Sequence, residues 1–336
     1  MKVLITGTSA RTASANRVGT LATAMSWALL NDDRMSVTHA VPGKTYGHDV
    51  AFIGLSSPTA PVSNYAYTGF AALAEAYADG RLGAVFIDQP SPGAIRSGAK
   101  TALDDYSRLA TNFYSKRPDY GRYVGDPKFR AKVHEGIALY LNEPLPLLAP
   151  MYPWGNVEAL SKRIPQGHHL HPVDPTGAYW SLAELITLPI DRSNRAPMWV
   201  IETAYAKPPK IRETLSYPII TTKSPATEQD FDTYAASSAV IEGDAPIKGW
   251  WTPTAAAALL SGAAFIGGPN TAVNFASPWM DVIESMGPTE LVDLVRRQTD
   301  NLRRSTWSMK SLADFLHDTA MLSVSSEAPG TQKIRL

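Results

Sequence analysis

The first half of the chain alternates short apolar runs with stretches of helical spacing. The runs that predict strands are residues 3–5, 37–41, 50–55, 84–87 and 145–149. Apolar residues recur every three or four positions at 20–30 and 66–78, which indicates helices between those strands. Strands that alternate with helices of this length are typical of βαβ units, so we expect a parallel sheet covered by helices.

The second half repeats this pattern in a shorter form. The predicted strands are 198–205, 238–242 and 263–266, and the predicted helices are 253–261, 289–305 and 308–321. The stretch between the halves is rich in Pro, Gly, His and Trp, which indicates a connection between two α/β domains. The predicted divisions are a first domain at 1–150, the connection at 151–195, a second domain at 196–307, and a closing helix and tail at 308–336 that pack back on the first domain.

Composition narrows the class of protein. The 336 residues include 31 basic and 31 acidic side chains and no cysteine. Disulfide frameworks, thiol nucleophiles, iron–sulfur clusters and Cys-based zinc sites are therefore excluded. No apolar run approaches a membrane span and the N-terminus does not resemble a signal peptide, so we expect a cytoplasmic protein with no membrane contact and no obligate protein partner. Balanced charge excludes a uniformly basic nucleic-acid coat but allows local basic clusters.

Gly7, Thr8 and Ser9 form a turn after the first predicted strand. A dinucleotide site at this place requires three spaced glycines, because the backbone must approach the pyrophosphate closely. The run 7–12 contains only one glycine. A nicotinamide-dependent dehydrogenase or epimerase is one interpretation of this turn, and an ordinary strand-to-helix connection is the other.

Asp88 and a group of three cations follow predicted strands. Asp88 comes directly after the apolar run 84–87, where a partly desolvated carboxylate can act as a general base or can cap the turn before Pro90. Lys207, Lys210 and Arg212 follow the strand predicted at 198–205. Cations at a strand end can neutralise a diphosphate leaving group, and surface solubility is the alternative.

Two further stretches carry unusual side chains. Basic and aromatic residues interleave at 106–130, which suits either a nucleic-acid backbone with stacked bases or an amphipathic helix pair with an aromatic core face. His168, His169 and His171 suggest either a metal tract or a polar loop between domains. Adjacent histidines point in different directions and no acidic ligand accompanies them, so we expect no metal site there.

The order of these segments resembles that of GT-B glycosyltransferases, in particular the β-glucosyltransferases of T-even phages that modify hydroxymethylcytosine in DNA. The residues that carry the likeness are 49–57, 84–92, 200–205, 239–244, 251–253, 262–266 and 289–294. The resemblance implies two Rossmann-like, doubly wound domains that face a cleft. It also implies an inverting transfer of a sugar from a nucleotide sugar, with a UDP-sugar expected, to a hydroxymethylated pyrimidine in double-stranded phage DNA.

The resemblance assigns roles to particular positions. Asp88 matches the family's catalytic base, and Lys207 with Lys210 or Arg212 stand where two arginines bind the donor phosphates. The positions expected to bind the donor nucleotide are Glu242, Asp244, Thr252 and Thr254. The positions expected to contact DNA are Lys116, Arg117, Arg122, Lys128 and Arg130. The fold requires no metal, although Mg²⁺ is possible.

The chain departs from the family at two positions of the donor helix. Ala257 stands where a glutamate usually holds the ribose hydroxyls, and Thr254 stands where the family has an arginine. The segment between Arg212 and Ser238 is also shorter. A non-catalytic nucleotide- or DNA-binding protein on this scaffold, and a GT-B enzyme with a non-DNA acceptor, therefore remain open alternatives.

Overall fold

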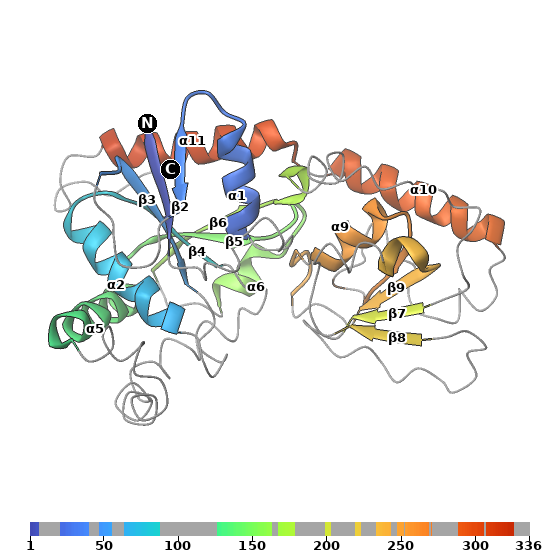
Figure 1. Ribbon diagram of the computed structural model, residues 1–336, viewed down its shortest axis with the longest axis horizontal. Coiled ribbons are helices and arrows are strands. Elements are labelled where there is room, and N and C mark those ends of the chain that lie inside the picture. Colours follow the sequence, from blue (N-terminus) through green and yellow to red (C-terminus); the bar gives the residue numbers. More distant parts are fainter. Residues whose placement is uncertain are drawn as a thin grey trace.

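The computed structural model contains two parallel sheets that lie side by side along the long axis of the molecule, with helices around them (Figure 1). The structure describes residues 1–6, 21–39, 47–55, 64–87, 126–162, 167–178, 199–202, 219–222, 233–242, 247–251, 253–268, 270, 288–305 and 307–325. The prediction of an α/β fold built on parallel strands is confirmed.

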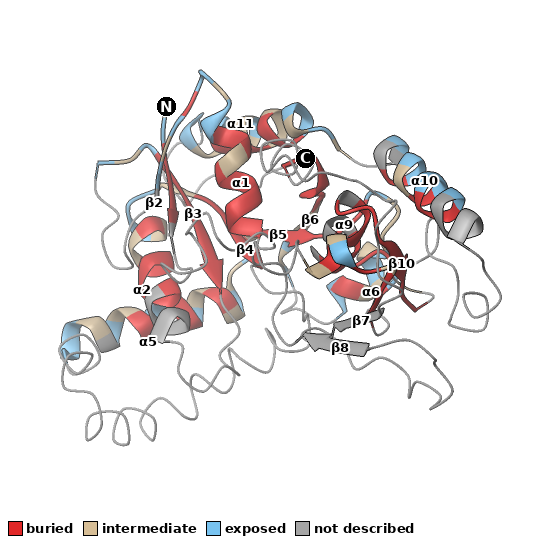
Figure 2. Cartoon of the chain, turned by 45° about the vertical axis from the view of Figure 1, so that its right-hand side comes forward, coloured by how far each residue is buried: buried red, intermediate tan, exposed pale blue. Residues whose placement is uncertain are grey.

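Among the described residues, the first sheet has six strands in the order β2-β1-β3-β4-β5-β6, all paired in parallel. The strands are β1 (Lys2–Thr6), β2 (Ser36–His39), β3 (Val50–Leu55), β4 (Leu82–Ile87), β5 (Pro146–Pro150) and β6 (His169–Val173). Their central members are apolar along their whole length, because helices cover both faces of the sheet (Figure 2).

The alternation of side chains along each strand divides the core between the two faces. Ile5, Phe52 and Phe86 pack with helices α1 (Leu21–Leu30) and α11 (Met309–Ser325). On the opposite face, Ile53 and Ile87 pack with α2 (Asn64–Ala78), α5 (Pro127–Asn142) and α6 (Val157–Ser161). The last helix that the structure describes, α11, is therefore part of the first sheet's core.

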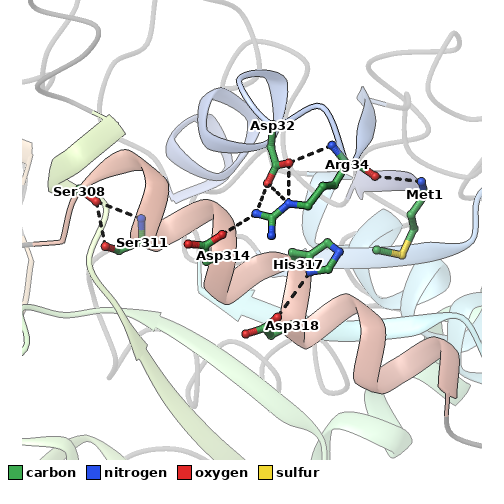
Figure 3. Close-up of polar contacts among 8 residues, drawn as sticks. All are labelled: Met1, Asp32, Arg34, Ser308, Ser311, Asp314, His317 and Asp318. Carbon is green, nitrogen blue, oxygen red and sulfur yellow. Dashed lines mark hydrogen bonds and ion pairs between the residues drawn. The ribbon is translucent and has the colours of Figure 1, made fainter.

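An ion-pair network joins α11 to the turn between α1 and β2 (Figure 3). Arg34 reaches Asp32 and Asp314 at 2.5 Å each, and its carbonyl accepts a hydrogen bond from the Met1 amino group at 3.1 Å. The hydrogen bonds from Arg34 lower the pKa of Asp32 to about 2. Because Asp314 lies on α11, the network adds a polar contact to the apolar docking of this helix.

In the part of the chain that the structure describes, the second sheet has four parallel strands in the order β10-β9-β7-β8. They are β7 (Trp199–Glu202), β8 (Ile219–Thr222), β9 (Ala239–Glu242) and β10 (Ala264–Ile266), accompanied by helices α9 (Pro253–Leu260) and α10 (Pro288–Ser305). Leu294 and Val295 of α10 pack on Ile241 and Ile266. Gln298 of the same helix bonds both the N–H and the C=O of Phe265, so the side-chain amide completes the edge strand.

Three expectations from the sequence need correction. His169 and His171 lie in β6, where they pair with β5, so this part of the histidine tract is a strand and not an interdomain loop. The first sheet therefore continues past residue 150 into the stretch predicted as a connection. The segment between Arg212 and Ser238 contains β8, which the pattern did not predict. The His and Pro residues of β6 interrupt the apolar pattern of a strand, so the pattern does not predict it. Its pairing with β5 shows that it is a strand.

The helices that the structure describes include none with the length and apolarity needed to cross a bilayer.

Candidate functional site

Each sheet reverses its strand order at one place. In the first sheet the reversal lies between β1 and β3, and in the second it lies between β7 and β9. Ligands of open parallel sheets bind outside the carboxyl ends of the strands at such a reversal. The last residues there are Thr6 and Leu55 in the first sheet, and Glu202 and Glu242 in the second.

Glu242 is a buried acid at the reversal of the second sheet. It lies opposite Glu202 in the β7–β9 register and is 1% exposed. The hydroxyl of Thr254, itself fully buried in the first turn of α9, donates a hydrogen bond to Glu242 Oε1 at 3.0 Å. Backbone N–H groups and the helix dipole favour negative charge at such a helix start. The carboxylate and the helix start are thus held together at the carboxyl edge.

Two backbone segments, 150–156 and 247–251, cross next to this edge, and we call their crossing the joint. Met151 and Trp250 form an antiparallel bridge. The Tyr152 N–H donates to the Gly249 carbonyl at 2.9 Å, and the Trp251 N–H donates to the Pro150 carbonyl at 3.2 Å. The first segment follows β5 and the second follows β9, so the joint ties the carboxyl end of one sheet to that of the other.

Glycines make the close crossing possible. A Cβ atom on Gly249 would lie 2.3 Å from Gly155 Cα, and Gly249 also has a φ of +76°. A Cβ atom on Gly155 would lie 3.0 Å from the Tyr152 carbonyl oxygen and 2.6 Å from the Met151 methyl group. The two backbone segments therefore lie so close together that a side chain at residue 249 would not fit between them.

The Tyr152 side chain is affected by acidic residues from both sheets. Its side chain is fully buried at the joint and stacks on Trp154, with ring centroids 4.6 Å apart and planes 4° from parallel. Burial raises the pKa of the Tyr152 phenol well above its usual value, and the charges of Asp174 and Glu242 raise it further. Asp174 follows β6 of the first sheet and Glu242 ends β9 of the second, so acids from both sheets act on one phenol.

Hydrogen bonds to Asp174 link the start of α11 to the end of β6 in the first sheet. Its side chain is 1% exposed; Oδ1 accepts hydrogen bonds from the Thr176 N–H and hydroxyl, and Oδ2 accepts one from the Trp307 N–H at 2.8 Å. A Cβ atom on Gly177 would lie 2.4 Å from the Met309 nitrogen, so backbone packs on backbone here too. Burial raises the pKa of Asp174 to about 6, although the three hydrogen bonds act in the opposite direction.

The structure brings together two of the residues predicted as site residues. Glu242 and Thr254, both assigned to the donor nucleotide, are in direct contact. Lys128 lies exposed in the first turn of α5, and Arg130 belongs to the same helix. This helix lies on the side of the first sheet away from the second sheet in both views (Figures 1 and 2). These two residues are therefore not part of the joint.

The other predicted positions lie outside the described residues. They are Gly7, Thr8, Ser9, Asp88, Lys116, Arg117, Arg122, Lys207, Lys210, Arg212, Asp244 and Thr252. Their strands are described, however: Asp88 follows the last residue of β4, and the turn at Gly7 follows the last residue of β1. Ala257 is a residue of α9, one turn beyond Thr254.

Sequence reasoning missed Tyr152, Asp174 and Trp250. Asp174 carries a recognisable signal, because Asp followed by Pro and Thr is typical of a helix N-cap with proline in the first turn. Tyr152 and Trp250 carry none, since their importance comes from a pairing between segments about 100 residues apart.

No family model and no curated protein matches the chain. Among solved structures, the chain is similar to phage T4 BGT in complex with its UDP-glucose substrate, at 11% identity and a TM-score of 0.46 over 96% of each chain. It is also similar to the N-terminal domain of Candida albicans trehalose-6-phosphate phosphatase, at 8% identity and a TM-score of 0.42 over 97% of each chain. Likeness at this level transfers no residue role to the chain.

Proposed function

We propose that the protein is a glycosyltransferase that binds a nucleotide sugar at the carboxyl edge of the second sheet and its acceptor at the carboxyl edge of the first. The observation that carries the proposal is the joint, where Met151 is bridged to Trp250 and the Tyr152 N–H is bonded to the Gly249 carbonyl, so that the backbone after β5 contacts the backbone after β9. The joint ties the carboxyl edge of the first sheet to that of the second, so substrates bound at the two edges can be held for a transfer between them. In domain terms this is a GT-B arrangement, in which the first sheet, including β6 and the helix α11, forms the acceptor side and the second sheet forms the donor side.

In this proposal the donor nucleotide lies against the start of α9. Glu242, oriented by the Thr254 hydroxyl, accepts hydrogen bonds from the ribose hydroxyls, because Ala257 offers no carboxylate for this purpose. Asp244 and Thr252 complete the nucleotide contacts. Lys207, Lys210 and Arg212 bind the diphosphate and stabilise the charge that develops on it. A UDP-sugar is the expected donor, and Mg²⁺ is compatible with the site but not needed by it.

The chemical step is a single displacement. The acceptor oxygen attacks the anomeric carbon, the bond from that carbon to the phosphate oxygen breaks, and the nucleoside diphosphate leaves with the electron pair. Asp88, directly after β4, takes the proton of the acceptor hydroxyl. A positioned base contributes about 10²–10⁴-fold to such a step. Attack from the face opposite the leaving group inverts the anomeric configuration.

The acceptor in the proposal is a hydroxymethylated pyrimidine of double-stranded phage DNA, in the host cytoplasm. The modified base must leave the helix stack to reach Asp88. Lys116, Arg117, Arg122, Lys128 and Arg130 then bind the phosphates. Neutral net charge with local basic clusters suits an enzyme that must release DNA after each turnover, because phosphate contacts set the affinity.

The decisive experiment supplies nucleotide sugars and weighs the product. Hydroxymethylated duplex DNA, unmodified DNA and small hydroxyl acceptors are incubated with a panel of donors, and the nucleosides are analysed by mass. We expect a gain of one sugar on the hydroxymethylated base alone. Asp88→Asn lowers kcat by about 10²–10⁴-fold with donor affinity unchanged, whereas Glu242→Gln weakens donor binding. Transfer at the wild-type rate by Asp88→Asn overturns the base assignment, and transfer only to small hydroxyls replaces the acceptor.

A second candidate is a non-catalytic nucleotide- or DNA-binding protein on the same scaffold. Ala257 favours it, because the donor helix lacks an acid of its own. Calorimetry separates the two functions: nucleotide or DNA binding without sugar transfer from any donor establishes the second candidate and excludes the first.

A further inference from the structure

Residues 247–251 pack with a different sheet from the one whose strands flank them in sequence. The segment leads from β9 to α9, both of which accompany the second sheet. Ile247 and Trp250 nevertheless belong to the hydrophobic core that α2, α5 and α6 build on the first sheet, in one cluster with Met151 and Leu160. Trp250 is fully buried and is one of the largest side chains in that core.

Backbone contacts also hold Trp250 in this place. Its N–H donates to the Ile247 carbonyl at 3.0 Å, and it is bridged to Met151. On one side of it, Gly249 crosses Gly155 with no space for a Cβ atom. On the other side, the Trp251 N–H is bonded to Pro150. The segment therefore cannot slide along the first sheet without breaking several contacts at once.

This anchor lies close to the candidate donor site along the chain. Thr254 follows Trp250 by four residues, and an extended chain covers roughly 14 Å over that distance. Trp251, in between, is 2% exposed. The place of Trp250 thus limits where the first turn of α9 can begin, and the Thr254 hydroxyl in that turn is bonded to the Glu242 carboxylate.

We propose that Trp250 is a positioning residue. Its ring is buried in the core of the first sheet and thereby fixes where the first turn of α9 lies. Through the Thr254 hydroxyl in that turn, it orients the Glu242 carboxylate, which binds the donor nucleotide. The donor site is then held by both sheets, and its geometry depends on how they are joined. The part that concerns the nucleotide rests on the proposed function, whereas the placement of α9 does not.

Three variants separate positioning from stability. Trp250→Ala removes the anchor. Trp250→Phe keeps an aromatic ring and loses no hydrogen bond, because the indole Nε1 has no partner among the described residues. Ile137→Ala is the matched control, since Ile137 is fully buried in the same core cluster but lies on α5, outside the joint.

The first measurement is hydrogen exchange of residues 254–260 without ligand, at one temperature at which all four proteins are folded. We expect the α9 amides of Trp250→Ala to exchange about tenfold faster than those of the wild type, and those of Trp250→Phe and Ile137→Ala to remain protected. Equal protection of α9 in Trp250→Ala and Ile137→Ala would overturn the proposal, because Trp250 would then be an ordinary core residue.

The second measurement is the calorimetric Kd of UDP and of a UDP-sugar. Trp250→Ala is expected to weaken both by about tenfold, Trp250→Phe to restore wild-type affinity, and Ile137→Ala to leave it unchanged. Unchanged affinity in Trp250→Ala overturns the coupling to the donor site. If the wild type binds no nucleotide, the proposed function fails, and hydrogen exchange still decides whether Trp250 places α9.

Discussion

Asp174 is the residue whose titration reports most directly on the contact between β6 and the start of α11. Its pKa is raised to about 6, mainly by burial, while a carboxyl in the unfolded chain titrates near 3.9. A raised pKa means that the folded state holds its proton more tightly than the unfolded state does. The contribution of Asp174 to stability is therefore complete below about pH 4 and is lost as pH rises through about 6.

We predict that Asp174→Asn reduces the fall in unfolding free energy between pH 4 and pH 8 by up to about 3 kcal/mol, as measured by urea titration. The variant also loses stability at every pH, because an amide cannot accept hydrogen bonds at both ends and leaves the Trp307 N–H unpaired. Thr176→Val removes a donor that lowers the pKa of Asp174, so the total loss of stability from low to high pH should become larger. Parallel pH profiles of Asp174→Asn and wild type would contradict the prediction.

The sequence allowed some site residues to be found and not others, for a physical reason. Glu242 and Thr254 stand at the end of a strand and the start of a helix, and both places follow from local pattern. Tyr152 and Trp250 matter because two distant segments pair, and pairing depends on the whole fold. Their neighbours in sequence carry no sign of it.

At the scale of elements, the joint depends on two backbone segments in contact. Gly249→Ala adds a methyl group where Gly155 lies and strains a positive φ, so we predict a loss of more than about 3 kcal/mol in unfolding free energy. Gly47→Ala is the matched control, because Gly47 has a φ of +85° but nothing within 4 Å of its Cβ position. Backbone strain alone costs about 1–2 kcal/mol there. Equal losses, measured by urea unfolding, would mean that the segments can move apart.

Local periodicity predicted most elements that the structure contains. β3 begins at Val50, where the apolar run begins, and α9 begins at Pro253, as predicted. The bounds of α10 differ from the predicted ones by one residue. The pattern did not predict α6 or most of α5. Two strands, β6 and β8, were not predicted either. Both are edge strands, which lack a second partner strand and need less of the apolar residue pattern that marks a central strand. The helix α11 was predicted to end at 321 and continues to Ser325, where apolar residues are exposed.

At the scale of the whole molecule, the two sheets share core and backbone contacts at more than one place. At the joint, Ile247 and Trp250 are buried in the core of the first sheet. Between α10 and α11, the Trp307 N–H is bonded to Asp174, and the backbone at Met309 packs against Gly177. Independent domains usually meet through polar contacts of limited area and can unfold separately. Here a side chain from between β9 and α9 is part of the other sheet's core, so unfolding of that core releases the start of α9.

We therefore predict that the wild type unfolds in urea in one transition, with coincident midpoints from tryptophan fluorescence and far-ultraviolet circular dichroism. Trp250→Ala should separate the transitions, because the second sheet then no longer depends on the first core. Ile137→Ala should lower the midpoint and keep a single transition, since it weakens the same core without disconnecting the sheets. Two transitions in the wild type, or one in Trp250→Ala, would show that the shared core does not couple them. Coupled unfolding would mean that the two sheets stabilise each other before any ligand binds, through the side chains that residues 247–251 place in the first core.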